Sequence, residues 1–329
     1  MTVRVYRSTD TSAPTLSGTA GALISVLDAV LVNGYGAQVA AGWTKPFSGT
    51  NLASYRQGTG SNNFYLKVRD DAPLTAQEAQ IRGFEVMTQV TSTDTGADGT
   101  SLFPTIAQSS ALLVRKSSVS DASPRTWMIL ADARTFYLFI LTGDTAAVYY
   151  STMFGEIYSF KTSDSYRTAI VSRVATGGSA GSENFCSMTF GSGQGGVLQI
   201  QTGHYLARDA SGSAGAIASN ELGNGGCNSS GTSTLSFSST NNLSMKNVTD
   251  HKVYLFPIRI GHIQGGNTVR GRYRGFWQAA HNQGTLSDGD TFTGSGSLAG
   301  KTFMVVKNVG ISGAAGAVCL ETSDTWDSN

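Results

Sequence analysis

The sequence predicts a mainly β protein, and three observations support this. Short apolar, aromatic and β-branched runs bounded by turn residues recur along the chain, most clearly at Trp127–Ala131, Thr135–Thr142 and Met153–Phe160. Glycine supplies 40 of the 329 residues, roughly twice the average share, as expected for a chain with many turns. A clear helical periodicity occurs once. We therefore predict sandwich-like antiparallel units with one N-terminal helix and long Gly/Ser-rich loops.

The N-terminal domain is expected to span residues 1–165 and to contain the helix. Apolar residues recur at helical spacing in residues 22–33, and Asn33-Gly34 supplies a stop signal. The other expected elements are strands, which we place at residues 2–6, 42–47, 52–56, 63–70 and 84–90. Residues 75–82 could instead form one or two helical turns.

The central strands of this domain are expected to form its core. Asp132-Ala-Arg separates Trp127–Ala131 from Thr135–Thr142, which predicts a hairpin that feeds the third strand, Met153–Phe160. The run from Phe136 to Leu141 is apolar or aromatic at every position, so both of its faces need cover. We predict a strand that is buried on both sides.

Two further segments follow. Residues 166–250 are a Gly/Ser/Asn-rich mixture with short apolar islands such as Val197–Ile200 and Leu235–Phe237. Such a composition is also typical of a flexible linker, but the recurring islands favour an ordered β insertion under long loops. Residues 251–329 form a C-terminal β segment, which could pack back on the first domain. Its apolar runs lie at residues 251–261, 272–277, 302–309 and 317–322.

Charge and hydropathy exclude several classes of partner. The formal net charge is +1 and charged residues make up 14% of the chain, so we expect no nucleic-acid partner. No run of 18 apolar residues occurs, so we expect no membrane partner. The N-terminus lacks the apolar segment of a secretory signal, and the chain is expected to fold in the cytoplasm.

The sequence predicts no metal, cofactor or catalytic residue. Cys186, Cys227 and Cys319 are an odd number without C-x-x-C spacing, which favours buried free thiols. The four histidines, at positions 204, 251, 262 and 281, never occur at the spacing of a metal cluster. Gly191–Gly196 formally matches a dinucleotide fingerprint, but the strand-like residues after it favour a glycine-rich hairpin loop.

Paired carboxylates for glycoside hydrolysis could come from Glu85, Asp132, Asp144 and Glu156. Glu156 is the one acid inside a strongly apolar stretch. A carboxylate on an ordinary strand face explains it more simply than catalysis does.

Three arginines alternate along one predicted strand. On a strand, Arg270, Arg272 and Arg274 would project from one face, and Phe276 and Trp277 follow them. Guanidinium and aromatic groups are enriched at the centres of protein interfaces. We predict that these five residues form a contact face for an acidic neighbour, although a solvated strand face would also fit. Contact with nucleic acid would need a more basic chain than this one.

Three groups of segments resemble uncharacterised virion structural proteins of tailed bacteriophages. The first group is Val5–Asp10, Ala13–Gly18, Leu27–Gly36 and Gly42–Phe47. The second is Arg134–Phe139 with Phe154–Phe160, and the third is Asp288–Phe292 with Leu298–Lys307. None of these segments is a catalytic motif, and the Gly/Ser-rich insertion is not part of the resemblance.

The resemblance implies a non-enzymatic structural part of the virion, made in the cytoplasm of the host bacterium. Its partners would be other virion proteins and copies of itself, in the tail, the baseplate or the capsid exterior. The alternative is a glycan-binding or glycan-cleaving module that the particle uses in host recognition, because a β-sandwich with long loops can carry such a site. Acids and aromatics in a cleft would favour that alternative.

Overall fold

The computed structural model describes residues 2–71, 77–93, 95–108, 111–143, 149–174, 202–209, 211–220, 255–262, 268–279, 287–307, 317–323 and 325–326. It confirms a mainly β protein with antiparallel strand pairing and one N-terminal helix. The strands are β1 (Arg4–Arg7), β2 (Thr44–Gly49), β3 (Leu52–Arg56), β4 (Tyr65–Arg69), β5 (Glu78–Met87), β6 (Gly99–Phe103), β7 (Leu112–Arg115), β8 (Thr126–Ala131), β9 (Thr135–Leu141), β10 (Tyr149–Glu156), β11 (Tyr158–Ser159), β12 (Thr168–Val174), β13 (Thr202–Arg208), β14 (Ala214–Asn220), β15 (Leu255–His262), β16 (Thr268–Ala279), β17 (Thr291–Thr293), β18 (Thr302–Lys307) and β19 (Ala317–Glu321).

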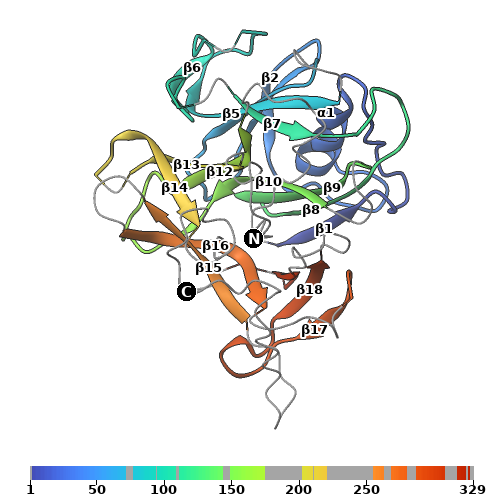
Figure 1. The fold of residues 1–329 in the computed structure, drawn as a ribbon, viewed down its shortest axis with the longest axis vertical. Helices are drawn as coiled ribbons and strands as arrows, with labels where there is room; N and C mark the ends of the chain where they lie inside the picture. The colour runs from blue at the N-terminus through green and yellow to red at the C-terminus, as the bar shows by residue number, and fades with distance from the viewer. Residues whose placement is uncertain are drawn as a thin grey trace, which may run out of the picture.

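A central sheet of strands β1, β8, β9, β10, β12 and β13, in that order, forms the middle of the molecule (Figure 1). Side chains alternate between its faces, so Phe136 and Leu138 enter one apolar cluster while Tyr137 and Phe139 enter another. Phe139 is 0% exposed. The prediction of a strand buried on both sides is confirmed, and the need to cover both faces explains its unbroken apolar run.

The first face of the central sheet is covered by the helix and by strands β2 to β7. The helix runs through α1 (Ala22–Leu27) and continues as a π-helical segment, η1 (Asp28–Asn33). Gly34 ends it with a φ of 78°, a conformation that favours glycine. The predicted helix at 22–33 is therefore confirmed, and its apolar stripe packs on the sheet.

The second face is covered by the C-terminal strands, drawn in orange and red in Figure 1. Strand β16 pairs with β15, β11 and β19, and β19 continues through β18 to β17. Strands β12 to β14 of the 166–250 segment join the central sheet to this second sheet. The islands Val197–Ile200 and Leu235–Phe237 lie outside the described residues.

The alternative of a helical turn within residues 75–82 is wrong for the part described. Residues from Glu78 onward belong to β5, which pairs with β4 and, on its other edge, with β7 and β6. Ala79 and Ile81 alternate into the first core cluster. Pairing on both edges outweighs the local helical preference of the Ala- and Gln-rich segment.

Candidate functional site

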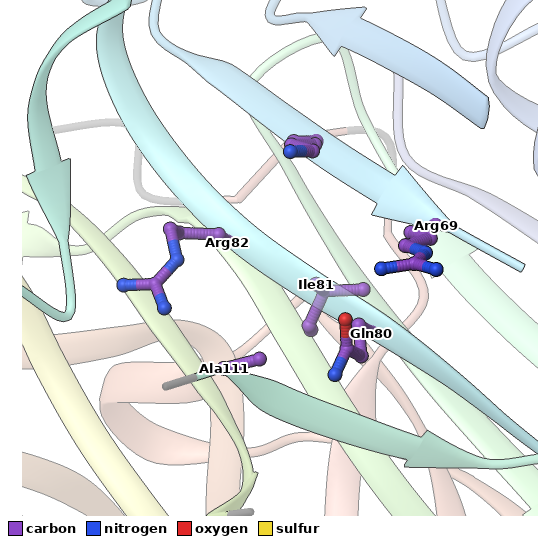
Figure 2. Close-up of a pocket in the computed structure, with 6 residues that line it drawn as sticks. Arg69, Gln80, Ile81, Arg82 and Ala111 are labelled. Atoms are coloured by element: carbon purple, nitrogen blue, oxygen red, sulfur yellow. The ribbon is translucent and has the colours of Figure 1, made fainter. Parts of the chain in front are cut away.

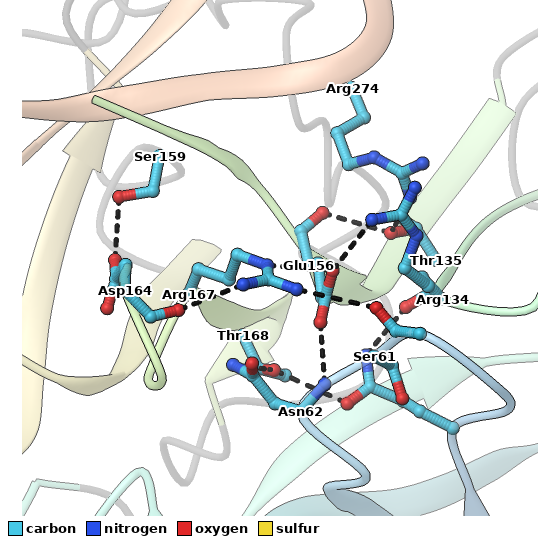
Figure 3. Close-up of polar contacts among 12 residues, drawn as sticks. Ser61, Asn62, Arg134, Thr135, Glu156, Ser159, Asp164, Arg167, Thr168 and Arg274 are labelled. Carbon is cyan, nitrogen blue, oxygen red and sulfur yellow. Dashed lines mark hydrogen bonds and ion pairs between the residues drawn. The ribbon is translucent and has the colours of Figure 1, made fainter. Parts of the chain in front are cut away.

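A polar cleft of about 620 Å³ lies at one end of the central sheet, and Figure 3 shows polar contacts among the residues around it. It lies beside the β8–β9 turn and the end of β10, next to the segment of residues 157–167 and strand β16. Its lining residues are Arg134, Glu156, Ile157, Tyr158, Ser159, Phe160, Lys161, Thr162, Ser163, Asp164, Arg167 and Arg274. Apolar strands thus end in a site made mainly of charges and hydroxyls.

The β8–β9 turn places Arg134 at the cleft. The Asp132 Oδ1 atom accepts hydrogen bonds from the backbone N–H groups of Arg134 and Thr135, both at 2.8 Å. The Trp43 indole N–H donates to the Asp132 carbonyl oxygen at 2.8 Å. These hydrogen bonds fix the conformation of the turn, so the side chain of Arg134 extends from a rigid backbone.

The back of the cleft is closed by a buried ion pair between the two sheets. Arg274 of β16 donates from Nη2 to Asp132 Oδ2 at 2.7 Å and from Nη1 to Asp132 Oδ1 at 3.2 Å. The Thr135 hydroxyl oxygen also accepts from Arg274 Nη1, at 3.0 Å. The guanidinium carbon lies 5.7 Å from the centre of the Trp326 ring. This bidentate pair therefore links the β8–β9 turn to the second sheet.

Glu156 lies below the mouth of the cleft and is 0% exposed. Its Oε1 accepts the backbone N–H of Asn62 at 2.6 Å, and its Oε2 accepts Arg167 Nε at 2.9 Å. Figure 3 shows Arg134 and Arg167 converging on it. Gly155 precedes it with a φ of 144° and lies so close to Thr135 that a Cβ would come within 2.4 Å of the Thr135 Cα. Both carboxylate oxygens of Glu156 are thus occupied.

Asp164 organises the segment that forms the outer wall. Its Oδ2 accepts the Ser159 hydroxyl at 2.6 Å, and its Oδ1 accepts the backbone N–H of Tyr166 at 3.0 Å. Arg270 of β16 donates from Nη2 to Asp164 Oδ1 at 2.8 Å. A second buried ion pair therefore holds this wall against the second sheet.

Two arginines share the carboxylate of Glu156. Arg167 Nε lies 2.9 Å from Glu156 Oε2, whereas Arg134 Nη1 lies 3.6 Å from the same oxygen, beyond hydrogen-bond distance. Burial, and then the neighbouring charge of Arg274, lower the pKa of Arg134. Arg134 is therefore an arginine of the cleft with a weakly held guanidinium.

This arrangement suits anion binding better than acid–base catalysis. A general acid or base must reach the reacting atom directly or through one water. Among the carboxylates of the cleft, Asp132 and Glu156 are 0% exposed and Asp164 is 3% exposed, and each is bonded to an arginine. Within the described part of the chain, no group of three or more His, Cys, Asp or Glu residues could hold a metal ion.

The predicted contact face is not assembled. Arg270 and Arg274 are each 3% exposed and pair with Asp164 and Asp132, while Phe276 is 0% exposed in the second core cluster and Trp277 is 8% exposed in a third. Arg272 is half-buried, with its guanidinium carbon 4.6 Å from the centre of the Tyr158 ring. The prediction that these residues share an exposed face is wrong.

Two physical reasons explain that error. Strand β16 bulges between Arg272 and Trp277, because the four residues between them lie opposite a single β15 residue. Gly275 in this bulge has a φ of 61°, and strict alternation is lost there. The acids that neutralise Arg270 and Arg274 also lie more than 100 positions away in sequence, so spacing along the strand could not reveal them.

The other predicted residues divide as follows. Of the four carboxylates considered for catalysis, Glu156 lines the cleft, Asp132 lies behind it bonded to Arg274, and Glu85 forms a bidentate pair with Arg208 elsewhere. Cys319 is a buried free thiol, and burial raises its pKa to about 12. Burial lowers the pKa of His204 to about 4, and its Nδ1 lies 3.0 Å from the Tyr273 hydroxyl. Outside the described residues lie Asp144, Cys186, Cys227, His251, His281 and Gly191–Gly196.

Sequence reasoning missed Arg134, Asp164 and Arg167. The nearest signal is the Asp132-Ala-Arg turn, whose pattern predicts a hairpin and assigns no role to Arg134. A second cavity, between β4, β5 and β7, is only about 10 Å³ (Figure 2), room for about one water at most. Its Lys67 pairs with Asp98, and Arg82 donates to the Pro104 carbonyl at 2.6 Å. We assign no ligand to it.

No protein-family model matches this chain, and no curated protein sequence matches it. Among the residues that the structure describes, no helix is both long and apolar enough to cross a membrane.

Proposed function

We propose that this chain is a non-enzymatic structural component of a tailed-bacteriophage particle, acting through contacts with copies of itself and with other particle proteins. The resemblance of the three groups of segments described above supports the phage assignment. The chain is also poor in charge, with 14% charged residues. A surface of hydroxyls, amides and backbone suits packing against neighbours in an assembly, because fewer ions must be desolvated there.

One observation supports a structural role over catalysis. The carboxylates of the described cleft are buried and bonded to arginines, two of which, Arg270 and Arg274, belong to β16 of the second sheet. Charges used in this way hold elements of the fold together and are not available for proton transfer. The site therefore favours a rigid building block.

The proposal is tested by locating the protein in purified particles. Quantitative mass spectrometry is expected to find it at a fixed copy number that matches a symmetry of the tail, baseplate or capsid. Labelling with an antibody in electron micrographs would distinguish these locations. Absence from washed particles, or hydrolysis of a glycan by the purified chain, would contradict the proposal.

A second candidate function, glycan binding, is favoured by one specific observation. The cleft combines Tyr158 and an exposed Phe160 with the hydroxyl side chains of Ser159, Thr162 and Ser163. Aromatic surfaces beside polar groups suit sugar rings, which have an apolar face and a polar edge. Binding of glycans by the isolated chain would support this function whether or not the chain also has a structural role.

A further inference from the structure

We infer that the cleft binds an acidic saccharide and that Arg134 holds the carboxylate of the sugar. This inference rests on the second proposed function and specifies its ligand. The charge around Glu156 is the first argument, since two arginines, Arg134 and Arg167, share this one buried carboxylate. A bound carboxylate would supply Arg134 with an anion of its own.

The second argument is the hydrogen bonding of Arg134. Among the described residues, its Nε is buried without a hydrogen-bond partner, and its ion pair with Glu156 is long at 3.6 Å. The arginines behind it are better held: Arg274 makes a bidentate pair with Asp132, and Arg167 Nε lies 2.9 Å from Glu156 Oε2. A guanidinium presents parallel N–H groups that match a carboxylate. Nε and Nη1 of Arg270 also lack a partner, but the Arg270 side chain is 2% exposed whereas that of Arg134 is 24% exposed. Arg134 is therefore the one of these two arginines that a ligand in the cleft can reach.

The third argument is the exposed aromatic ring and the hydroxyl groups of the cleft, which suit a sugar better than a simple anion. Phe160 is 53% exposed at the cleft, and its ring centre lies 6.0 Å from that of Tyr158. The guanidinium of Arg272 already occupies a face of Tyr158, which leaves Phe160 as the open aromatic surface. Thr162 and Ser163 add exposed hydroxyls to the lining. A cleft of about 620 Å³ lies within the common range of ligand sites, about 300–1,000 Å³.

The experiment titrates the purified full chain with each of four probes and measures the binding affinity by ligand-observed NMR and by calorimetry. The probes are trigalacturonic acid and its neutral counterpart galactotriose, with inorganic phosphate and a triglutamate peptide as other anions. We expect the acidic trisaccharide to bind at least about tenfold more tightly than each of the other probes, since a charge-assisted bidentate pair discriminates by about that factor.

Two pairs of variants test the residues. Arg134→Gln is expected to weaken trigalacturonate binding about tenfold or more, whereas Arg56→Gln, which removes an exposed arginine of β3, should leave it unchanged. Phe160→Ala is expected to weaken binding about fivefold, from loss of a stacking surface. Its control is Phe256→Ala, at a residue that is 43% exposed on β15. Circular dichroism on each variant checks that it remains folded.

Each other outcome overturns the inference in a recognisable way. Equal affinity for the two trisaccharides would contradict the inference that the ligand is acidic, and it would still support the glycan-binding function. Tighter binding of triglutamate would identify the cleft as a contact for an acidic protein segment. Tighter binding of phosphate would indicate a simple anion site. Absence of binding to every probe would overturn both the inference and the glycan-binding function, while the location of the protein in particles would be unaffected.

Discussion

Two clusters of charge inside this protein use similar residues and differ in balance and access. At the start of the helix, Asp70 and Lys116 form an ion pair in which both side chains are 0% exposed. Asp70 also accepts the backbone N–H of Leu23 at 2.7 Å, and Lys116 donates to the Thr19 carbonyl at 2.6 Å. In the cleft, by contrast, two arginines share the carboxylate of Glu156, and these arginines, Arg134 and Arg167, are 24% and 28% exposed.

Exposure to solvent and bonding to backbone groups distinguish a structural ion cluster from a binding site. In the pair of Asp70 and Lys116, the helix cluster, one carboxylate meets one ammonium, each also bonds to backbone groups, and neither side chain is exposed to a ligand. Such a pair gives little net stability relative to apolar packing, but losing one partner is costly because the other charge stays buried. In the cleft the two arginines on Glu156 are partly exposed to solvent. Stability should therefore depend on the inner pairs, and ligand binding on the outer arginine.

The largest effect is expected from Lys116→Met. This change leaves Asp70 buried without its ammonium partner and should lower the free energy of unfolding by about 3–5 kcal/mol. The matched control is Lys45→Met, because Lys45 pairs with Asp28 with side chains 28% and 22% exposed. We expect the control to lose less than about 1 kcal/mol. Urea denaturation of both variants measures the contrast, and equal losses would show that burial does not distinguish the two pairs.

Arg274→Met is expected to cost slightly less, about 3 kcal/mol. It removes the inner pair of the cleft, but Asp132 keeps two backbone N–H bonds, from Arg134 and Thr135. The Met side chain can still pack against the Trp326 ring. Thermal unfolding followed by circular dichroism measures the loss. A variant with wild-type stability would show that the link between the β8–β9 turn and β16 contributes nothing.

Gly155→Ala is expected to cost about 2–3 kcal/mol, from backbone strain and a direct collision. The new Cβ would come within 2.4 Å of the Thr135 Cα and 2.5 Å of the Arg134 carbonyl oxygen, and the φ at this position is 144°. The control is Gly212→Ala, where φ is 96° but nothing lies within 4 Å. The control should lose only the strain energy, about 1 kcal/mol. If both variants lose equally, close approach at Gly155 is not what requires glycine.

The sequence allowed the fold class and the central core to be predicted, because local patterns determine both. The helix at 22–33 followed from apolar residues at helical spacing, and the strand at 135–141 from an unbroken apolar run between turn residues. The start of the strand at Glu78–Met87 was less certain, because the local composition of residues 75–82 also suits a helical turn, and pairing with β4 and β7 decides between them.

The cleft could be predicted only in fragments. Asp132 and Glu156 were noticed as acids, and Arg270 and Arg274 as cations, yet nothing in their spacing paired one set with the other. The ion pairs of Arg270 and Arg274 each join residues more than 100 positions apart, so they depend on how the two sheets pack. The bulge of β16 also moved Arg274 away from the face that strict alternation predicts.

The smallest effect on stability is expected from Arg134→Gln, within about 1 kcal/mol of wild type in either direction. Arg134 makes no close ion pair, while Arg274 repels it and burial disfavours its charge, so losing the charge relieves two unfavourable terms. Glu156 remains bonded to Asn62 and Arg167 in this variant. Arg167→Gln is the matched comparison and should lose about 1–3 kcal/mol, because it removes a charge-assisted hydrogen bond to a buried carboxylate. Urea denaturation of both variants at low and high salt measures the difference. If Arg134→Gln proves the more destabilising, Arg134 belongs with the structural ion pairs, and the contrast between the helix cluster and the mouth of the cleft is lost.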